Sequence, residues 1–223
     1  MLTVCFYLGI RSGYFSGLKG YLKKISTKPY LGLFLMICAL FFLALFFDLR
    51  VLKTLQGINH PLGVLADQLG GYLSKNTVLW ITLSSLYFLS FIARHKLSSE
   101  ILYGVLLATA FTGIVSQITK FIFVRARPYS DLGPFSFFNW DGMRKDMYQS
   151  LPSGDVALVA GASFLAFYSV RNLYLKAFLL ILPLAAAFFR VVENKHWPSD
   201  TLVSIGIGMM VGFLVWDYKK IQV

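Results

Sequence analysis

Three short polar clusters interrupt the apolar sequence between Lys120 and Asp200. They contain residue types that can bind an anion and carry out nucleophilic chemistry. Each cluster lies at the end of a hydrophobic run, so we expect them to meet at one face of a membrane and form a site suited to a phosphate group. The residues of interest are Lys120 and Arg127, then Ser153, Gly154 and Asp155, then Arg190, His196 and Asp200.

The first two clusters supply positive charge and a helix start. Lys120 and Arg127 are seven residues apart, about two helical turns, and would share a face if the helix continued past Pro128. The alternative is two cations at a helix end that reach for the membrane interface. Ser153 and Gly154 open an apolar run, where free backbone N–H groups and the helix dipole attract anions. Taken alone, that pair is equally typical of any helix start.

The third cluster holds the candidate nucleophile. His196 and Asp200 are four residues apart, at the beginning of the last apolar run. We expect Asp200 to reach one ring nitrogen of His196, leaving the other nitrogen as a nucleophile or base. A purely structural pair would have the same spacing. Arg190 ends an apolar run, where a charge needs a partner.

Composition indicates an integral membrane protein. Of the 223 residues, 57% are hydrophobic and 14% charged, against about 45–50% and about 25% in soluble domains. The net charge of +11 does not indicate a nucleic-acid-binding protein, because the basic residues are scattered between apolar segments. We expect membrane lipids and an anionic substrate as partners, and no nucleic acid. Cys5 and Cys38 lie in apolar surroundings and suggest neither a disulfide nor a metal site.

The hydrophobic pattern predicts an all-α, integral membrane six-transmembrane-helix bundle that forms a single domain over residues 1–223. A basic N-terminal arm, 1–28, precedes the first span. A span needs at least about 17 residues. The predicted spans cover about 31–47, 78–93, 101–124, 153–171, 176–192 and 199–216.

The distribution of charge predicts the orientation. Lysines and arginines of the short loops dominate one face, which favours cytoplasmic N and C termini. All three polar clusters then lie on the extracytoplasmic side. The loop 125–151 is amphipathic, and such loops often lie in the interface as a lid or lipid-contact surface.

The clusters also match a known pattern. Lys120 with Arg127-Pro128, Pro152-Ser153-Gly154, and Arg190 with His196 and Asp200 resemble, in order and spacing, the three-part signature of the type 2 phosphatidic acid phosphatase (PAP2) superfamily. The likeness covers about 80 residues, and the six-helix layout extends it over most of the chain.

This resemblance implies a phosphatase that uses no metal or cofactor and works through a phosphohistidine. His196 would attack phosphorus and Asp200 would orient it. The phosphoryl oxygens would be held by Lys120, Arg127, Arg190, the Ser153 hydroxyl and the Gly154 amide. Arginine provides a fork of donors for phosphate and lysine a point charge.

Two positions depart from the family pattern. Phe189 replaces a serine, which removes at most a supporting hydrogen bond. Asp155 stands where the family has a histidine that protonates the leaving oxygen. Aspartate is normally ionised at neutral pH and would then repel the substrate. Three explanations stay open: a substitution introduced into a natural phosphatase, a natural variant in which Asp155 or another group such as His60 is the acid, or a diphosphate substrate that depends less on an acid.

The resemblance leaves the substrate open. Undecaprenyl diphosphate, phosphatidylglycerophosphate, phosphatidic acid and lipid A phosphate all fit a site at the interface. By family likeness we expect a bacterial inner-membrane enzyme of lipid metabolism. The alternative is a catalytically inactive protein that binds or transports a lipid phosphate. The sequence does not determine the oligomeric state.

Overall fold

The computed structural model describes residues 28–57 and 96–222. Within these ranges every regular element is a helix. The α-helices are α3 (Lys28–Leu45), α4 (Asp48–Gly57), α7 (Lys96–Phe123), α8 (Gly154–Ser169), α9 (Leu173–Val192) and α10 (Pro198–Gln222). Of the predictions, the arm before Lys28, the span 78–93 and the candidate acid His60 lie outside the described residues.

The all-α class is confirmed, and each predicted span within the described ranges coincides with a helix. Helices α7, α9 and α10 are long and apolar enough to cross a membrane. The pair α3 and α4 also qualifies as one broken span, while α8 is a shorter apolar helix of 16 residues. Up to four crossings are therefore found in the described ranges, and the predicted total of six stays a prediction.

The first span differs from the prediction at its end. The span predicted over about 31–47 ends at Leu45, and a new helix, α4, starts at Asp48 and turns 65° away from α3. The Asp48 side chain is completely buried. An acidic residue is favourable at the start of a helix, because it faces the positive end of the helix dipole.

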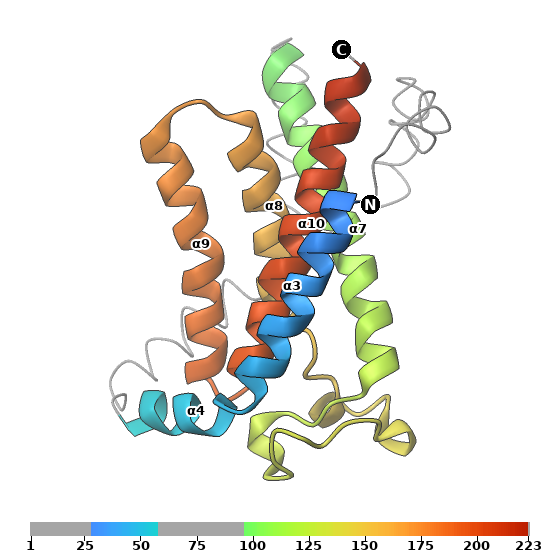
Figure 1. Ribbon diagram of the computed structural model, residues 1–223, viewed down its shortest axis with the longest axis vertical. Coiled ribbons are helices and arrows are strands. Elements are labelled where there is room, and N and C mark those ends of the chain that lie inside the picture. Colours follow the sequence, from blue (N-terminus) through green and yellow to red (C-terminus); the bar gives the residue numbers. More distant parts are fainter. Residues whose placement is uncertain (1–27, 58–95, 223) are drawn as a thin grey trace.

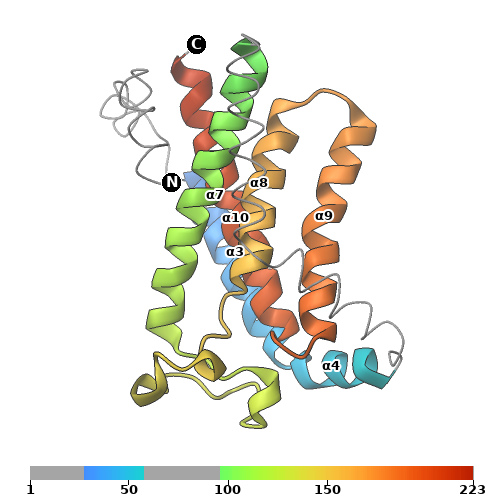
Figure 2. The same ribbon diagram turned by 180° about the vertical axis from the view of Figure 1, so that it is seen from behind.

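Helix α10 forms the centre of the bundle. It packs against α8 most extensively and also against α3 and α7, as Figures 1 and 2 show from opposite sides. Glycines let α8 and α10 approach closely: a Cβ at Gly208 would lie 2.4 Å from that of Ala160, and one at Gly212 would lie 3.0 Å from the backbone nitrogen of Leu165. Small residues are typical of such close helix contacts in membranes.

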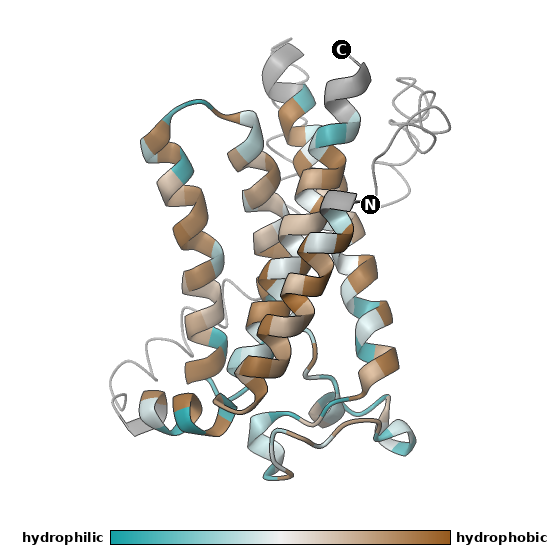
Figure 3. Ribbon diagram, in the orientation of Figure 1, coloured by the Kyte–Doolittle hydropathy of each residue, from teal (hydrophilic) through white to brown (hydrophobic). Residues whose placement is uncertain are grey.

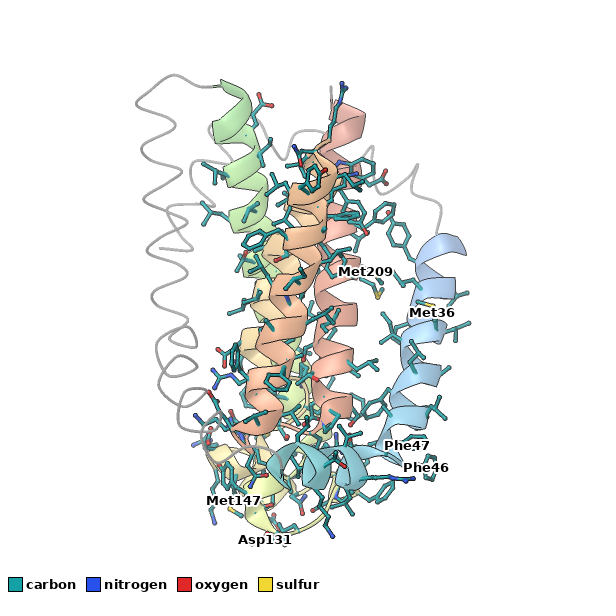
Figure 4. The ribbon with its side chains drawn as sticks, turned by 90° about the vertical axis from the view of Figure 1, so that its left-hand side faces the viewer. Met36, Phe46, Phe47, Asp131, Met147 and Met209 are labelled. Carbon is teal, nitrogen blue, oxygen red and sulfur yellow. The ribbon has the colours of Figure 1, made fainter. Side chains whose placement is uncertain are left out.

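The polar segments gather at one end of the bundle. The last turn of α7, the loop that follows it, the start of α8, the turn between α9 and α10, and α4 all lie at the lower end in Figure 1. Figure 3 shows apolar residues along the helices and polar residues concentrated in that lower loop. Phe46, Phe47, Asp131 and Met147 mark the same end in Figure 4. The three clusters of the sequence are therefore brought to a common end.

Candidate active site

The segment after α7 carries the first cluster into the site. Val124 adopts a left-handed backbone conformation, with φ 39°, which is strained for a β-branched residue. The chain then runs through residues 125–127 between two parts of the following loop. The Ala126 N–H donates to the Ser136 carbonyl at 2.9 Å, and the Ser150 N–H donates to the Arg125 carbonyl at 3.1 Å. The loop therefore holds this segment along both edges.

Arg127 and Lys120 approach the site from different elements. Helix α7 ends at Phe123, so the continuous helix that would place both on one face does not form. Arg127 Nη2 lies 2.8 Å from Asp146 Oδ1, and among the described residues its buried Nε has no partner. Lys120 Nζ lies 3.7 Å from the position that a Cβ would occupy at Gly154. The lysine ammonium therefore lies within contact distance of the first residue of α8.

The beginning of α8 offers unused donors. Ser153 is the N-cap residue, but its side chain makes no capping hydrogen bond. Its hydroxyl is buried and has no partner within the described ranges, although its backbone N–H donates to Ser204 Oγ at 2.8 Å. A buried hydroxyl without a partner is unfavourable. A phosphate oxygen bound here would satisfy it, and so the second cluster has the properties expected of an anion site.

His196 is buried with its tautomer fixed. Its Nδ1 lies 2.7 Å from the Ser150 carbonyl oxygen, which can only accept a hydrogen bond. Nδ1 therefore carries the proton and Nε2 keeps its lone pair. Burial, followed by the positive charges of Arg127 and Lys120, lowers the pKa of His196 well below its usual range. The imidazole is consequently neutral at physiological pH and Nε2 is available as a nucleophile.

Asp200 does not make the contact expected from the sequence. Its Oδ2 lies 3.9 Å from His196 Nδ1, beyond hydrogen-bond distance. Asp200 instead accepts hydrogen bonds from Ser150 Oγ at 2.5 Å, from the Trp197 N–H at 3.0 Å and from Arg125 Nη1. Ser150 therefore stands between the pair: its hydroxyl binds Asp200 and its carbonyl binds His196. The predicted orienting role of Asp200 would act through Ser150.

Arg190 is shared between two carboxylates. Its Nη2 lies 2.5 Å from Asp155 Oδ2 and its Nη1 lies 2.6 Å from Glu193 Oε2. Lys195 Nζ extends this chain of charges at 3.3 Å from the same Glu193 oxygen. The His196 N–H donates to the Arg190 carbonyl at 3.3 Å, so the arginine is close to the candidate nucleophile. Asp155 thus occupies one of the donors that Arg190 could offer to an anion.

Four buried contributors were missed by the sequence reasoning. The sequence motifs assign no role to Asp48, Arg125, Ser150 or Glu193. Their spacing resembles no motif, and only the folded chain brings them together. The one available signal was chemical, since a charge directly beside an apolar run needs a partner. This applies to Asp48, which follows Phe47.

The fold is that of a helical protein with several helices able to cross a membrane, and it gathers a candidate anion-binding site at one end of the bundle. Three cations, a helix start and a neutral histidine suit phosphoryl transfer. Within residues 28–57 and 96–222 no group of three or more potential metal ligands is found. Residues 101–222, more than half of the chain, match the PAP2 superfamily. The chain belongs to this superfamily, and the resemblance noted in its motifs is confirmed.

A solved structure supports the same fold. The chain is similar to the crystal structure of Aquifex aeolicus LpxE, with a TM-score of 0.58 and 21% sequence identity over 76% of this chain and 94% of that one. Comparison with curated protein sequences gave no match. Family and fold together support a lipid phosphatase in a membrane.

Proposed function

We propose that this protein is a metal-independent lipid phosphatase that forms a phosphohistidine at His196. The observation that carries the proposal is the fixed tautomer of this residue. Its Nδ1 is engaged by the Ser150 carbonyl, and Lys120, Arg127 and Arg190 place positive charge around the ring. A neutral imidazole next to three cations suits attack on an anionic phosphoryl group.

The proposed reaction has two displacements. Nε2 of His196 attacks phosphorus, and the bond between phosphorus and the leaving oxygen breaks. The electron pair leaves with that oxygen, which takes a proton from water or from an acid. Water then attacks the phosphohistidine, the nitrogen–phosphorus bond breaks, and phosphate leaves with His196 restored. Throughout, Lys120, Arg127, Arg190 and the Ser153 hydroxyl stabilise the charge on the equatorial oxygens.

Asp155 affects both the proton donation and the phosphate binding of the proposed mechanism. Its Oδ2 accepts a hydrogen bond from Arg190, and an oxygen engaged in this way does not serve as the proton donor of the mechanism. It also neutralises one cation of the phosphate site. A diphosphate lipid suits such a site best, because its leaving phosphate is less basic than an alkoxide. With Asp155 in place, we therefore expect turnover of a diphosphate substrate to be impaired less than turnover of a monophosphate.

We further propose an extracytoplasmic site in the cytoplasmic membrane of a bacterium, with both termini inside. The aromatic loop after α7 supports this placement at an interface, since Phe135, Phe138 and Trp140 are exposed there. Aromatic side chains are enriched at membrane–water boundaries. A lipid phosphate would reach the site sideways from the outer leaflet.

The test is phosphate release by the purified protein in detergent with a chelator present. The substrates are phosphatidic acid, phosphatidylglycerophosphate, lipid A phosphate and undecaprenyl diphosphate. The unaltered chain, His196→Asn and Asp155→His are compared, with Asp141→Asn as a control in the exposed loop. We expect turnover that His196→Asn abolishes and that Asp141→Asn retains. Activity only in Asp155→His would identify a disabled phosphatase. Phosphate binding without turnover by the unaltered chain and by Asp155→His would favour the binding or transport protein.

A further inference from the structure

A buried polar network joins the bend between α3 and α4 to the start of α10. Arg125 lies at its centre, and the side chains of Arg125, Asp48 and Asp200 are all completely buried. The guanidinium uses its five N–H groups. Nε and Nη2 donate to the Pro134 carbonyl at 3.0 and 2.7 Å, and Nη2 also donates to Asp48 Oδ2 at 2.7 Å. Nη1 donates to Ser199 Oγ at 2.8 Å and to Asp200.

Asp48 binds the first turn of α10 directly. Its Oδ1 accepts the Ser199 backbone N–H at 2.8 Å, and its Oδ2 accepts the Ser199 hydroxyl at 2.5 Å. The first N–H groups of a helix have no partner within that helix. Asp48 supplies one from 151 residues away in the sequence. It therefore performs the function of an N-cap side chain for α10 while belonging to another helix.

The first turn of α10 also contains Asp200, which is connected to the candidate nucleophile through Ser150. Asp200 accepts the hydroxyl of Ser150, and the carbonyl of Ser150 binds Nδ1 of His196. Ser150 is held from the other side by the carbonyl of Arg125. Asp48 and Arg125 thus reach His196 through two connected routes, one through Asp200 and one through the Ser150 backbone.

We propose that Asp48 is a positioning residue for His196, acting through Arg125, Ser199 and Asp200. This inference rests on the proposed role of His196 as the nucleophile. Asp48 lies outside residues 101–222, which match the superfamily, and its side chain binds Arg125 and Ser199 rather than the proposed phosphate-binding side chains. Its removal should therefore impair the orientation of the imidazole and the chemical step, while phosphate binding persists.

Charge balance makes Asp48 and Arg125 interdependent. The buried group contains one cation and two carboxylates. Asp48→Asn leaves one charge of each sign, whereas Arg125→Gln leaves two buried carboxylates without a cation, which is strongly unfavourable. Asp48→Asn should consequently restore part of what Arg125→Gln loses. Independent structural roles would instead give effects that add.

The experiment combines two measurements on the full chain. Side-chain NMR of histidine reports the tautomer of His196, whose signal is assigned by its loss in His196→Asn. Single-turnover kinetics, with protein in excess over substrate, give a rate constant per folded site. The variants are Asp48→Ala, Asp48→Asn, Arg125→Gln and the Asp48→Asn, Arg125→Gln pair. Asp141→Asn, in the exposed loop, is the matched control.

We expect the Nδ1–H tautomer in the unaltered chain and a tautomer mixture in Asp48→Ala. The single-turnover rate constant should fall roughly 10- to 100-fold in Asp48→Ala, as misplaced catalytic groups commonly cause. It should fall less in Asp48→Asn, which keeps an acceptor for Ser199. The dissociation constant of inorganic phosphate should stay unchanged in both. If the chain and its Asp155→His variant show no turnover, the proposed function fails, and the NMR measurement still tests the positioning.

A merely structural role predicts a different pattern. The amount of folded protein would decrease, but the tautomer and the rate constant per folded site would match the unaltered chain. That result in Asp48→Asn, or no rescue of Arg125→Gln by Asp48→Asn, would overturn the proposal. Asp48→Asn keeps the size and one of the two acceptor oxygens of the native residue, so the test does not depend on Asp48→Ala folding.

Discussion

Competition for Arg190 is the main issue at the scale of single residues. Asp155 binds Arg190, so a phosphate bound as proposed would have to displace a carboxylate before it gains this donor. Asp155→Asn removes the charge and keeps the size. We expect it to lower the inhibition constant of inorganic phosphate roughly tenfold, because a hydrogen bond to a charged group contributes about 1.5–3 kcal/mol. Competition kinetics or calorimetry would measure this. An unchanged or weaker affinity would mean that Asp155 does not compete with phosphate.

In the proposed mechanism, the protonation of His196 sets the pH dependence of activity. Its lowered pKa means that the imidazole stays neutral, and therefore nucleophilic, at a pH where an ordinary histidine is protonated. The acid limb of kcat/KM, which reports groups of the free enzyme, should lie well below the ordinary histidine value of about 6.5. Arg127→Gln removes a repulsive charge and should move this limb to higher pH. A limb at or above pH 6.5 in the unaltered chain would contradict the burial of a neutral imidazole.

The limits of sequence reasoning are also clear at this scale. Spacing and residue type led to Lys120, Arg127, Ser153, Arg190 and His196, because cations and a histidine beside apolar runs have few other uses. The role of Ser150 could not be predicted, since half of it comes from a backbone carbonyl. The position of the Asp200 carboxylate relative to His196 could not be predicted either. Asp200 binds Arg125, which lies 75 positions away in the sequence.

At the scale of helices, the hydrophobic pattern predicts which segments of the described chain are helical, but it predicts less well the residues at which each helix begins and ends. Helix α7 begins at Lys96, before the predicted start of its span at about 101. Helix α4 begins at Asp48, directly after the predicted end of the first span at 47. The Asp48 side chain binds Arg125 and Ser199, partners that local composition does not record.

Close packing of α8 against α10 gives the prediction at this scale. A Cβ at Gly208 would lie 2.4 Å from Ala160 Cβ and 2.6 Å from the Gly161 nitrogen, so Gly208→Ala must push the helices apart. Overpacking of this kind costs about 1–3 kcal/mol, and thermal unfolding in detergent should show lower stability. Gly32→Ala in α3 is the matched control, because nothing lies within 4 Å of its added methyl group. Equal unfolding temperatures for the two variants would show that the contact is not tight.

At the scale of the whole molecule, the common end of the three clusters must face one side of the membrane. The site loop and the connection between α8 and α9 lie at opposite ends of the bundle (Figure 2). Cysteine labelling can therefore decide the orientation. In a background with Cys5 and Cys38 replaced by serine, Asp141→Cys marks the site end and Tyr174→Cys, which replaces a side chain 87% exposed, marks the other. Because loop lysines and arginines favour cytoplasmic termini, an impermeant maleimide should label Asp141→Cys in intact bacterial cells and Tyr174→Cys only after permeabilisation. The reverse pattern would place the site in the cytoplasm, where the substrate would be a lipid phosphate of the inner leaflet.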